Sequence, residues 1–176
     1  HPVTLEKSTS SDQIKELLMA LGKMNDVGLI FTMPNADTDG RILFQQIKSF
    51  CKSHPNAHAY TSLGQLRYLS CIKYMDGVIG NSSSGLSEVP SFHKGTINIG
   101  DRQRGRLRAA SVIDCSADEI AITESINRLF SPSFLAKLPN VKSPYGNGGA
   151  SEAIVKILER RSYDHLLKKR FFDLTS

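Results

Sequence analysis

Residues 77–88, GVIGNSSSGLSE, carry the clearest indication of the fold. A short apolar strand at 77–80 runs into a turn of small hydroxyl side chains and glycine, and a short helix is predicted from Leu86 to Phe92. Strands that are apolar on both faces are typical of parallel sheets buried between helices. This segment therefore predicts one strand–loop–helix unit of an α/β domain.

The same alternation of strands and helices extends along the chain in both directions. The pattern predicts strands at 27–33, 57–61, 95–99 and 111–115, and helices around 42–50, 63–75, 118–130 and 150–161. Such alternation specifies a parallel sheet with right-handed crossovers, covered by helices on both faces. We therefore predict an α/β fold with a doubly wound, Rossmann-like parallel sheet.

The ends of the chain and one long loop complete the predicted elements. Ser10 or Ser11 is expected to cap a first helix whose apolar residues repeat along 14–21. Residues 132–149 are expected to be the longest irregular stretch, and a final helix is predicted at 163–172.

Length and composition fit one domain spanning residues 1–176, with 40% hydrophobic residues and a net charge of +5. No apolar run approaches the roughly 20 residues that a membrane span needs. Because the first residues contain neither an initiator Met nor a signal peptide, we expect the chain to begin within a larger protein.

Charge and cysteine usage exclude several classes of function. The basic residues within 160–170 are typical of a solvated helix face, and they lack the interleaved aromatics of a nucleic-acid site. The three cysteines are widely spaced, with no CxxC pair. Free thiols in a reducing cytoplasm are therefore expected, with no zinc site, no nucleic acid and no membrane as partner.

The loop at 80–88 is the best candidate for a binding site. A strand leading through small residues into a helix points backbone N–H groups and the positive end of the helix dipole at one spot, which suits a phosphate. Glu88 follows in the first turns of that helix, where its carboxylate could accept hydrogen bonds from the two hydroxyls of a ribose. A capped turn, with Glu88 favouring the helix dipole, is the alternative.

Three further loops follow predicted strands or open a helix. Asn35 could bind a phosphate or sugar, or its loop could be an Asx-turn. The arginines of 100–106 could bind a diphosphate or form an exposed basic loop, and 146–149 could be a linker turn. His1 could donate to a phosphate or transfer protons, or it could be inert. No Ser/His/Asp arrangement, HExxH or Walker motif is present.

Taken together, these loops resemble a known family. The blocks at 76–90 and 98–106 resemble UDP-N-acetylglucosamine 2-epimerases, and the segments 1–4, 34–37 and 145–148 also match the landmarks of that family. The similarity is closest to the hydrolysing branch, which begins sialic acid synthesis by making N-acetylmannosamine and UDP. The non-hydrolysing branch usually has Asp-Ser-Gly-Gly and then Gln-Glu-Glu where this chain has residues 81–88, NSSSGLSE.

The resemblance implies a two-domain architecture and a different role for each domain. Members have two doubly wound domains in the glycosyltransferase-B (GT-B) arrangement, with substrate between them. This chain resembles the C-terminal, UDP-binding half, so the carboxylates that abstract the C2 proton would lie in the N-terminal half. There, anti-elimination of UDP would give a glycal, and addition of water would give the 2-epimer. The fragment alone is expected to be inactive, with no metal or cofactor, and the full-length protein to be a homodimer.

The resemblance also assigns roles to individual residues. Ser82 and Ser83 would hold the diphosphate, and Glu88 would take the ribose hydroxyls. Arg102 and Asn35 would contact the nucleotide.

Two further assignments lie elsewhere in the chain. His1 would face the phosphate and sugar, and could assist the reaction. The loop before Leu63 would flank uracil, largely through backbone contacts.

Several other functions remain open at this point. Within the same scaffold, the protein could be a non-hydrolysing UDP-GlcNAc 2-epimerase or could act on a UDP-diacetamido sugar. A stand-alone nucleotide-sugar-binding module and a glycosyltransferase half-domain are the alternatives of a different class.

Overall fold

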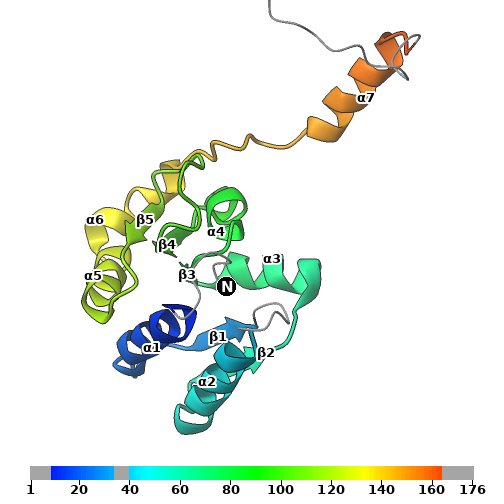
Figure 1. Ribbon diagram of the computed structural model, residues 1–176. Coiled ribbons are helices and arrows are strands. Elements are labelled where there is room, and N and C mark those ends of the chain that lie inside the picture. Colours follow the sequence, from blue (N-terminus) through cyan, green and yellow to red (C-terminus); the bar gives the residue numbers. More distant parts are fainter. Residues whose placement is uncertain (1–8, 34–39, 164–176) are drawn as a thin grey trace, which may run out of the picture. The chain divides into compact units, whose positions relative to one another are not determined.

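The computed structural model describes residues 9–33 and 40–163, in two compact units, 1–146 and 147–176 (Figure 1). His1, Asn35 and nearly all of the helix expected at 163–172 lie outside the described residues.

The strands of the first unit confirm the parallel pairing. They are β1 (Leu29–Thr32), β2 (Ala57–Tyr60), β3 (Gly77–Gly80), β4 (Gly95–Ile99) and β5 (Val112–Cys115). β1 pairs with β2, and β4 pairs with β3 on one side and β5 on the other, all in parallel. The ladders therefore form a two-stranded and a three-stranded group rather than one continuous sheet.

Helices connect these strands in the predicted order. They are α1 (Thr9–Gly22), α2 (Gly40–Ser53), α3 (Gly64–Tyr74), α4 (Ser84–Ser87), α5 (Glu119–Leu129) and α6 (Pro132–Leu135), with 3-10 turns at Val89–Phe92 and Leu138–Asn140. Asp118 caps α5 as the sequence predicts, because its side chain accepts a hydrogen bond of 2.9 Å from the backbone N–H of Ala121.

Three local expectations are wrong. Ser10 and Ser11 lie inside α1, which already includes Thr9; the Ser11 hydroxyl instead accepts a hydrogen bond from Gln46 of α2. The stretch 132–149 contains α6 and a 3-10 turn, with Ser131 as the cap of α6.

The third error concerns the helix expected at 86–92. α4 ends at Ser87 and gives way to the 3-10 turn of 89–92. Pro90 has no N–H with which to continue the α-helical hydrogen-bond ladder, which accounts for the change.

The core of the first unit is centred on β4, which is buried along its whole length. Since side chains alternate across a strand, Ile97 and Ile99 share one face, where they belong to the same apolar cluster as Ile122, Ile126 and Leu129 of α5. Thr96 and Asn98 occupy the other face, toward α4, which also packs on β4. β4 therefore has the apolar cluster with α5 on one face and α4 on the other.

Two strand glycines allow α5 to approach the sheet closely. A Cβ at Gly95 would lie 2.3 Å from Cδ1 of Leu129, and one at Gly77 would lie 2.7 Å from Cδ2 of the same leucine. Real Cβ contacts are never this short, so the absence of a side chain at both positions is what allows Leu129 to pack against β3 and β4.

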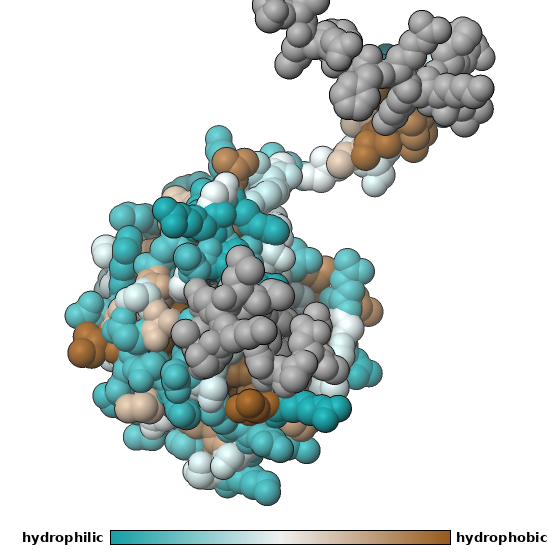
Figure 2. All heavy atoms as spheres, in the orientation of Figure 1, coloured by the Kyte–Doolittle hydropathy of each residue, from teal (hydrophilic) through white to brown (hydrophobic). Residues whose placement is uncertain are grey.

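The second unit contributes one described helix, α7 (Ala150–Arg160). It buries none of its residues, and its large apolar side chains are half exposed or more: Ile154, Val155, Ile157 and Leu158. Figure 2 shows brown, hydrophobic surface where Figure 1 labels α7. Across both units, no described helix is long and apolar enough to cross a bilayer.

Candidate functional site

The loops that follow β3 and β4 meet at one edge of the three-stranded group. The two strands are parallel neighbours, with Gly80 opposite Asn98 in the register. Their carboxyl ends therefore lie side by side, which is where open α/β sheets bind ligands. The sequence predicted candidate residues in both loops.

A single carbonyl group joins these two loops. The backbone oxygen of Asn81 accepts a hydrogen bond of 3.1 Å from Nη1 of Arg102 and one of 2.8 Å from Nε2 of Gln103. Gln103 is only 3% exposed, although it lies among charged residues in the sequence. Gln103 is not predictable as a site residue from the sequence, because a polar residue inside a basic loop carries no pattern that indicates burial.

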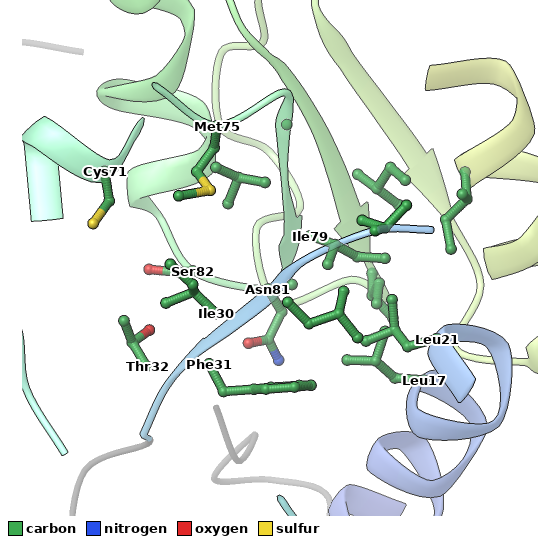
Figure 3. Close-up of a pocket in the computed structure, with 18 of the residues that line it drawn as sticks. Leu17, Leu21, Ile30, Phe31, Thr32, Cys71, Met75, Ile79, Asn81 and Ser82 are labelled. Atoms are coloured by element: carbon green, nitrogen blue, oxygen red, sulfur yellow. The ribbon is translucent and has the colours of Figure 1, made fainter. Parts of the chain in front are cut away.

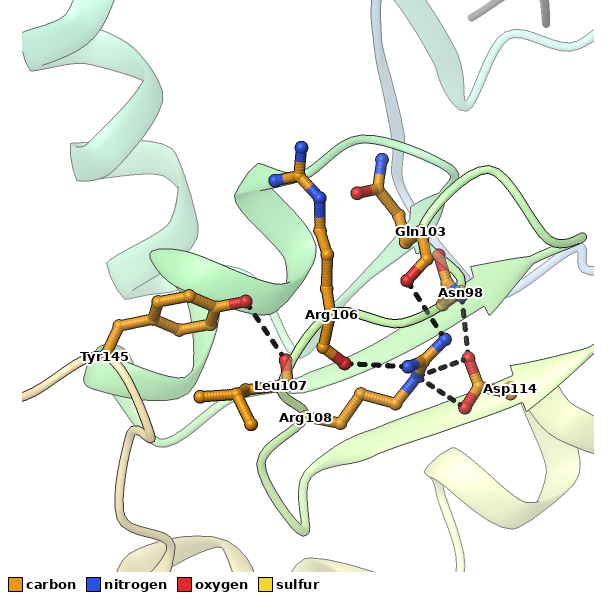
Figure 4. A network of polar contacts seen from close by, with 7 residues as sticks. All are labelled: Asn98, Gln103, Arg106, Leu107, Arg108, Asp114 and Tyr145. Atoms are coloured by element: carbon orange, nitrogen blue, oxygen red, sulfur yellow. Dashed lines mark hydrogen bonds and ion pairs between the residues drawn. The ribbon is translucent and has the colours of Figure 1, made fainter. Parts of the chain in front are cut away.

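The basic loop after β4 is held in place by Arg108 (Figure 4). Its Nε lies 2.8 Å from Oδ2 of Asp114 on β5, and its Nη1 and Nη2 donate to the carbonyl oxygens of Arg106 and Gln103 at 2.8 and 3.2 Å. Asn98, which is fully buried, donates from Nδ2 to Oδ1 of Asp114 at 2.7 Å. One guanidinium group therefore connects two points of the loop backbone, at Gln103 and Arg106, to Asp114 of β5.

The loop after β3 leads into α4 through Ser82 and Ser83. Ser83 is the N-cap, and its carbonyl accepts the N–H groups of Leu86 and Ser87 at 3.0 Å. The N–H of Gly85 donates to the carbonyl of Ser82 at 3.2 Å, so the turn itself binds the N–H groups of Gly85 and Leu86 at the start of α4. The hydroxyl of Ser84 is bound to that of Tyr68 at 2.5 Å, which ties α4 to α3.

Glu88 lies at the end of α4 rather than in its first turns, which corrects the expectation from sequence. It is the C-cap of this short helix, and its N–H donates to the carbonyl of Ser84 at 2.9 Å. Its carboxylate acts on the Tyr68–Ser84 pair: burial raises the pKa of the Tyr68 phenol, the Ser84 hydrogen bond lowers it, and the negative charge of Glu88 raises it further. Glu88 therefore remains beside the candidate loop.

A cavity of about 450 Å³ begins at this edge and extends between β1 and β3 (Figure 3). Leu63, Tyr68, Asn81, Ser82 and Ser84 all contribute to its lining. The structure thus brings Leu63, the N-cap of α3, to the same space as Ser82, although nineteen positions separate them in the sequence.

The exposed side of the edge is strongly basic. Arg102, Arg104 and Arg106 are all exposed, so their charges face solvent and any ligand that approaches. Within residues 9–33 and 40–163, no three His, Cys, Asp or Glu side chains come together as a metal site. The edge presents hydroxyl and guanidinium donors, which are groups that suit an anion.

Comparison with known proteins identifies the family. The sequence profile described as UDP-N-acetylglucosamine 2-epimerase matches residues 1–159. The chain is 42% identical over 160 residues to the polysialic acid biosynthesis protein P7 of Escherichia coli, covering 90% of this chain and 41% of that protein. It is 39% identical over 176 residues to the hydrolysing GDP/UDP-N,N'-diacetylbacillosamine 2-epimerase of Campylobacter jejuni, covering 99% and 45%.

A solved structure agrees with the fold. The UDP-GlcNAc 2-epimerase of Neisseria meningitidis, bound to UDP-GlcNAc, superposes with a TM-score of 0.66 at 21% identity, over 85% of this chain and 41% of that one. The expected Rossmann-like, GT-B-related architecture is thereby confirmed. The chain spans less than half the length of the curated relatives it matches. It belongs to the UDP-N-acetylglucosamine 2-epimerase family.

Proposed function

We propose that this chain is the UDP-binding, C-terminal half of a hydrolysing UDP-sugar 2-epimerase. The observation that carries the proposal is the joined pair of loops at the ends of β3 and β4, in which the Asn81 carbonyl holds Arg102 and Gln103 beside Ser82 and Ser83. Hydroxyl donors from one loop and cations from the other therefore lie close together.

The diphosphate is assigned to this convergence. The hydroxyls of Ser82 and Ser83 donate to its oxygens, and Arg102 supplies a forked cation at the edge. Arg102 donates one N–H to the carbonyl of Asn81, and its guanidinium group has further N–H donors for a phosphate. The polar contact to Asn81 thus positions the guanidinium without neutralising it.

The ribose is assigned to Glu88. A carboxylate that accepts two hydroxyl hydrogen bonds distinguishes a ribose from a phosphate, which it repels. Its position at the far end of α4 from Ser83 separates the negative carboxylate from the diphosphate. Leu63, which contributes to the lining of the cavity, is assigned to the uracil side, with the backbone of its loop.

The reaction is proposed to be hydrolytic: UDP-GlcNAc and water give N-acetylmannosamine and UDP. A relative at 39% identity is named as a hydrolysing epimerase, and the loop NSSSGLSE at 81–88 departs from the pattern of the non-hydrolysing branch. That relative is named for a diacetamido sugar, so a UDP-diacetamido sugar is the second candidate substrate.

The remaining residues of the proposed active site lie outside the part of the chain that the structure describes. The C2 proton is removed by carboxylates of the N-terminal half, so the isolated chain binds UDP but does not epimerise. The proposal also assigns His1 to the phosphate and sugar, and Asn35 to the nucleotide. The full-length enzyme is proposed to work in the cytoplasm as a homodimer.

Calorimetry with UDP and 2′-deoxy-UDP tests the binding assignment. Unmodified chain should bind UDP about tenfold more tightly than 2′-deoxy-UDP, since hydrogen bonds to a charged group contribute about 1.5–3 kcal/mol. Glu88→Gln should lower the affinity for UDP by about tenfold and abolish the preference between the two ligands. Glu124→Gln on α5, exposed and remote from the loops, is the matched control. No measurable binding of UDP to the unmodified chain would contradict the proposal.

The full-length enzyme tests the reaction. Incubation with UDP-GlcNAc should release free N-acetylmannosamine and UDP. Proton NMR follows the formation of both products. Accumulation of UDP-ManNAc with no free sugar would contradict the hydrolytic assignment and favour the non-hydrolysing branch.

A further inference from the structure

Asn147 is the one asparagine of this chain that is followed by glycine. It lies with Gly148 and Gly149 at the start of the second unit, directly before α7. All three residues are exposed, and Gly148 and Gly149 have φ angles of 93° and 78°, in the left-handed region that favours glycine. This short segment therefore combines an amide side chain with a backbone that no neighbouring side chain shields.

Both groups that react in asparagine deamidation are free in this segment. The side-chain amide of an asparagine is attacked by the backbone nitrogen of the next residue when that nitrogen can approach it. In the part of the chain that the structure describes, neither the Asn147 side chain nor the N–H of Gly148 has a hydrogen-bond partner. A Cβ at Gly148 would meet nothing within 4 Å, so the space around this nitrogen is open.

Every other asparagine precedes a residue with a side chain, and the structure shows further restraints at several of them. Asn140 is exposed, but its neighbour Val141 is branched at Cβ, and the N–H of Val141 donates to the carbonyl of Leu138 at 3.1 Å. Asn56 donates from Nδ2 to two backbone carbonyls, and Asn98 is fully buried. Exposure alone therefore does not select the reactive position, whereas a free nitrogen on a glycine does.

We propose that Asn147 is a modification site, at which spontaneous deamidation converts the side-chain amide to a carboxylate. The nitrogen of Gly148 attacks Cγ of Asn147 and forms a cyclic succinimide, and the amide nitrogen leaves as ammonia with the proton that the Gly148 nitrogen gives up. Water then opens the succinimide at either carbonyl, which gives aspartate or isoaspartate. The reaction needs only water and does not depend on UDP.

Both products change the segment that leads into α7. Each adds one negative charge two positions before Gly149, the N-cap of α7, close to the positive end of the helix dipole. Isoaspartate also routes the backbone through the former side chain, which adds one carbon to the path between Gly146 and Gly148. The amide is not restored, so this change in charge and backbone length accumulates with the age of the molecule.

Peptide mapping after incubation tests the site. Trypsin releases residues 138–142 and 143–156 as neighbouring peptides, whose only side-chain amides are those of Asn140 and Asn147. Asn147 should deamidate at least about tenfold faster than Asn140, because a β-branched neighbour with a bonded N–H hinders attack. Its products should include both isoaspartate and aspartate. Asn147→Gln, whose longer side chain closes the ring far less readily, should leave the second peptide unmodified.

Two outcomes of this mapping would overturn the proposal. Equal rates at Asn140 and Asn147 would show that the free nitrogen of Gly148 confers no reactivity. Aspartate formed without isoaspartate would show direct hydrolysis of the side chain, with no succinimide.

The effects of pH and of unfolding provide a second measurement. The attacking nitrogen must lose its proton, so the rate at Asn147 should rise severalfold with each unit of pH above neutrality. The rate in the folded chain should remain within about twofold of the rate in urea, since the fold engages neither reacting group. A folded-state rate lower by about tenfold or more would overturn the proposal, because the structure would then restrain the segment. So would a rate that does not change with pH.

Discussion

Thr96 and Gly85 fix the candidate loop to the sheet through one close contact. The hydroxyl of Thr96 on β4 donates a hydrogen bond of 2.7 Å to the carbonyl of Gly85 in α4, and a Cβ at Gly85 would lie 2.7 Å from the Thr96 methyl group. Both residues are buried. The position of α4, and with it that of Ser82 and Ser83, therefore depends on a glycine facing a threonine.

Gly85→Ala should weaken UDP binding more than it weakens the fold. The added methyl group cannot fit against Thr96 unless α4 moves outward, which breaks the Thr96 hydrogen bond and displaces the start of the helix. We expect a loss of UDP affinity of tenfold or more in calorimetry, and destabilisation of about 1–3 kcal/mol in urea denaturation.

Gly28→Ala is the control for that experiment. A Cβ at Gly28 meets nothing within 4 Å, so UDP affinity should stay unchanged. Unchanged UDP affinity in Gly85→Ala as well would mean that α4 does not contribute to the binding site.

Arg108→Lys should loosen the basic loop without removing its charge. Lysine keeps the cation, but its single ammonium group cannot bridge Asp114 and the carbonyls of Arg106 and Gln103 at once. We expect about a five- to tenfold loss of UDP affinity, corresponding to one or two neutral hydrogen bonds. The partly exposed ion pair itself contributes at most about 1 kcal/mol to stability.

A matched substitution in the same loop separates positioning from charge. Arg104→Lys, also exposed, should leave UDP affinity within twofold of the unmodified chain. Equal losses in the two variants would contradict a particular positioning role for Arg108, because lysine keeps the positive charge at both positions.

Gly95→Ala should destabilise the core directly. The new Cβ would lie 2.3 Å from Leu129 and 2.9 Å from Phe134, so α5 and α6 must both shift. Overpacking of this kind costs about 1–3 kcal/mol, measured as the free energy of unfolding in urea. The double variant Gly95→Ala with Leu129→Val should recover part of the loss if the clash with Leu129 is its cause, and no recovery would contradict that explanation.

The Asp118 cap should make stability depend on pH in acid. The backbone N–H of Ala121 and the Ser116 hydroxyl donate to this carboxylate and lower its pKa below the ordinary 3.8. A lowered pKa in the folded state stabilises the protein above the unfolded value, and this contribution is lost as pH falls through the folded value.

Comparison with a neutral cap measures this effect. Asp118→Asn keeps an N-cap side chain that does not titrate. The difference in urea midpoint between the unmodified chain and Asp118→Asn should be constant from pH 7 to pH 5 and should shift against the unmodified chain below about pH 4. A constant difference down to pH 2.5 would contradict the assigned role of the carboxylate.

The sequence by itself determined the order and type of the main elements. Apolar runs and helical repeats record which positions face a core, so the five strands and the longer helices fall where the pattern predicts them. The cap at Asp118 and the loop at 80–88 were also predictable, because both depend on residues close together in the chain. The family could be inferred for the same reason, from contiguous blocks.

Only the tertiary structure decided which distant groups meet. Nothing near Gln103 in the sequence indicates that it is buried against the carbonyl of Asn81, or that Arg108 reaches Asp114. The division of the described strands into two groups, with a cavity lined by β1 and β3, is likewise visible only in three dimensions, since both strands have the apolar pattern of interior strands. The physical reason is that local pattern encodes how far each position is buried, whereas the partner of a buried polar group or of a strand edge is set by long-range packing.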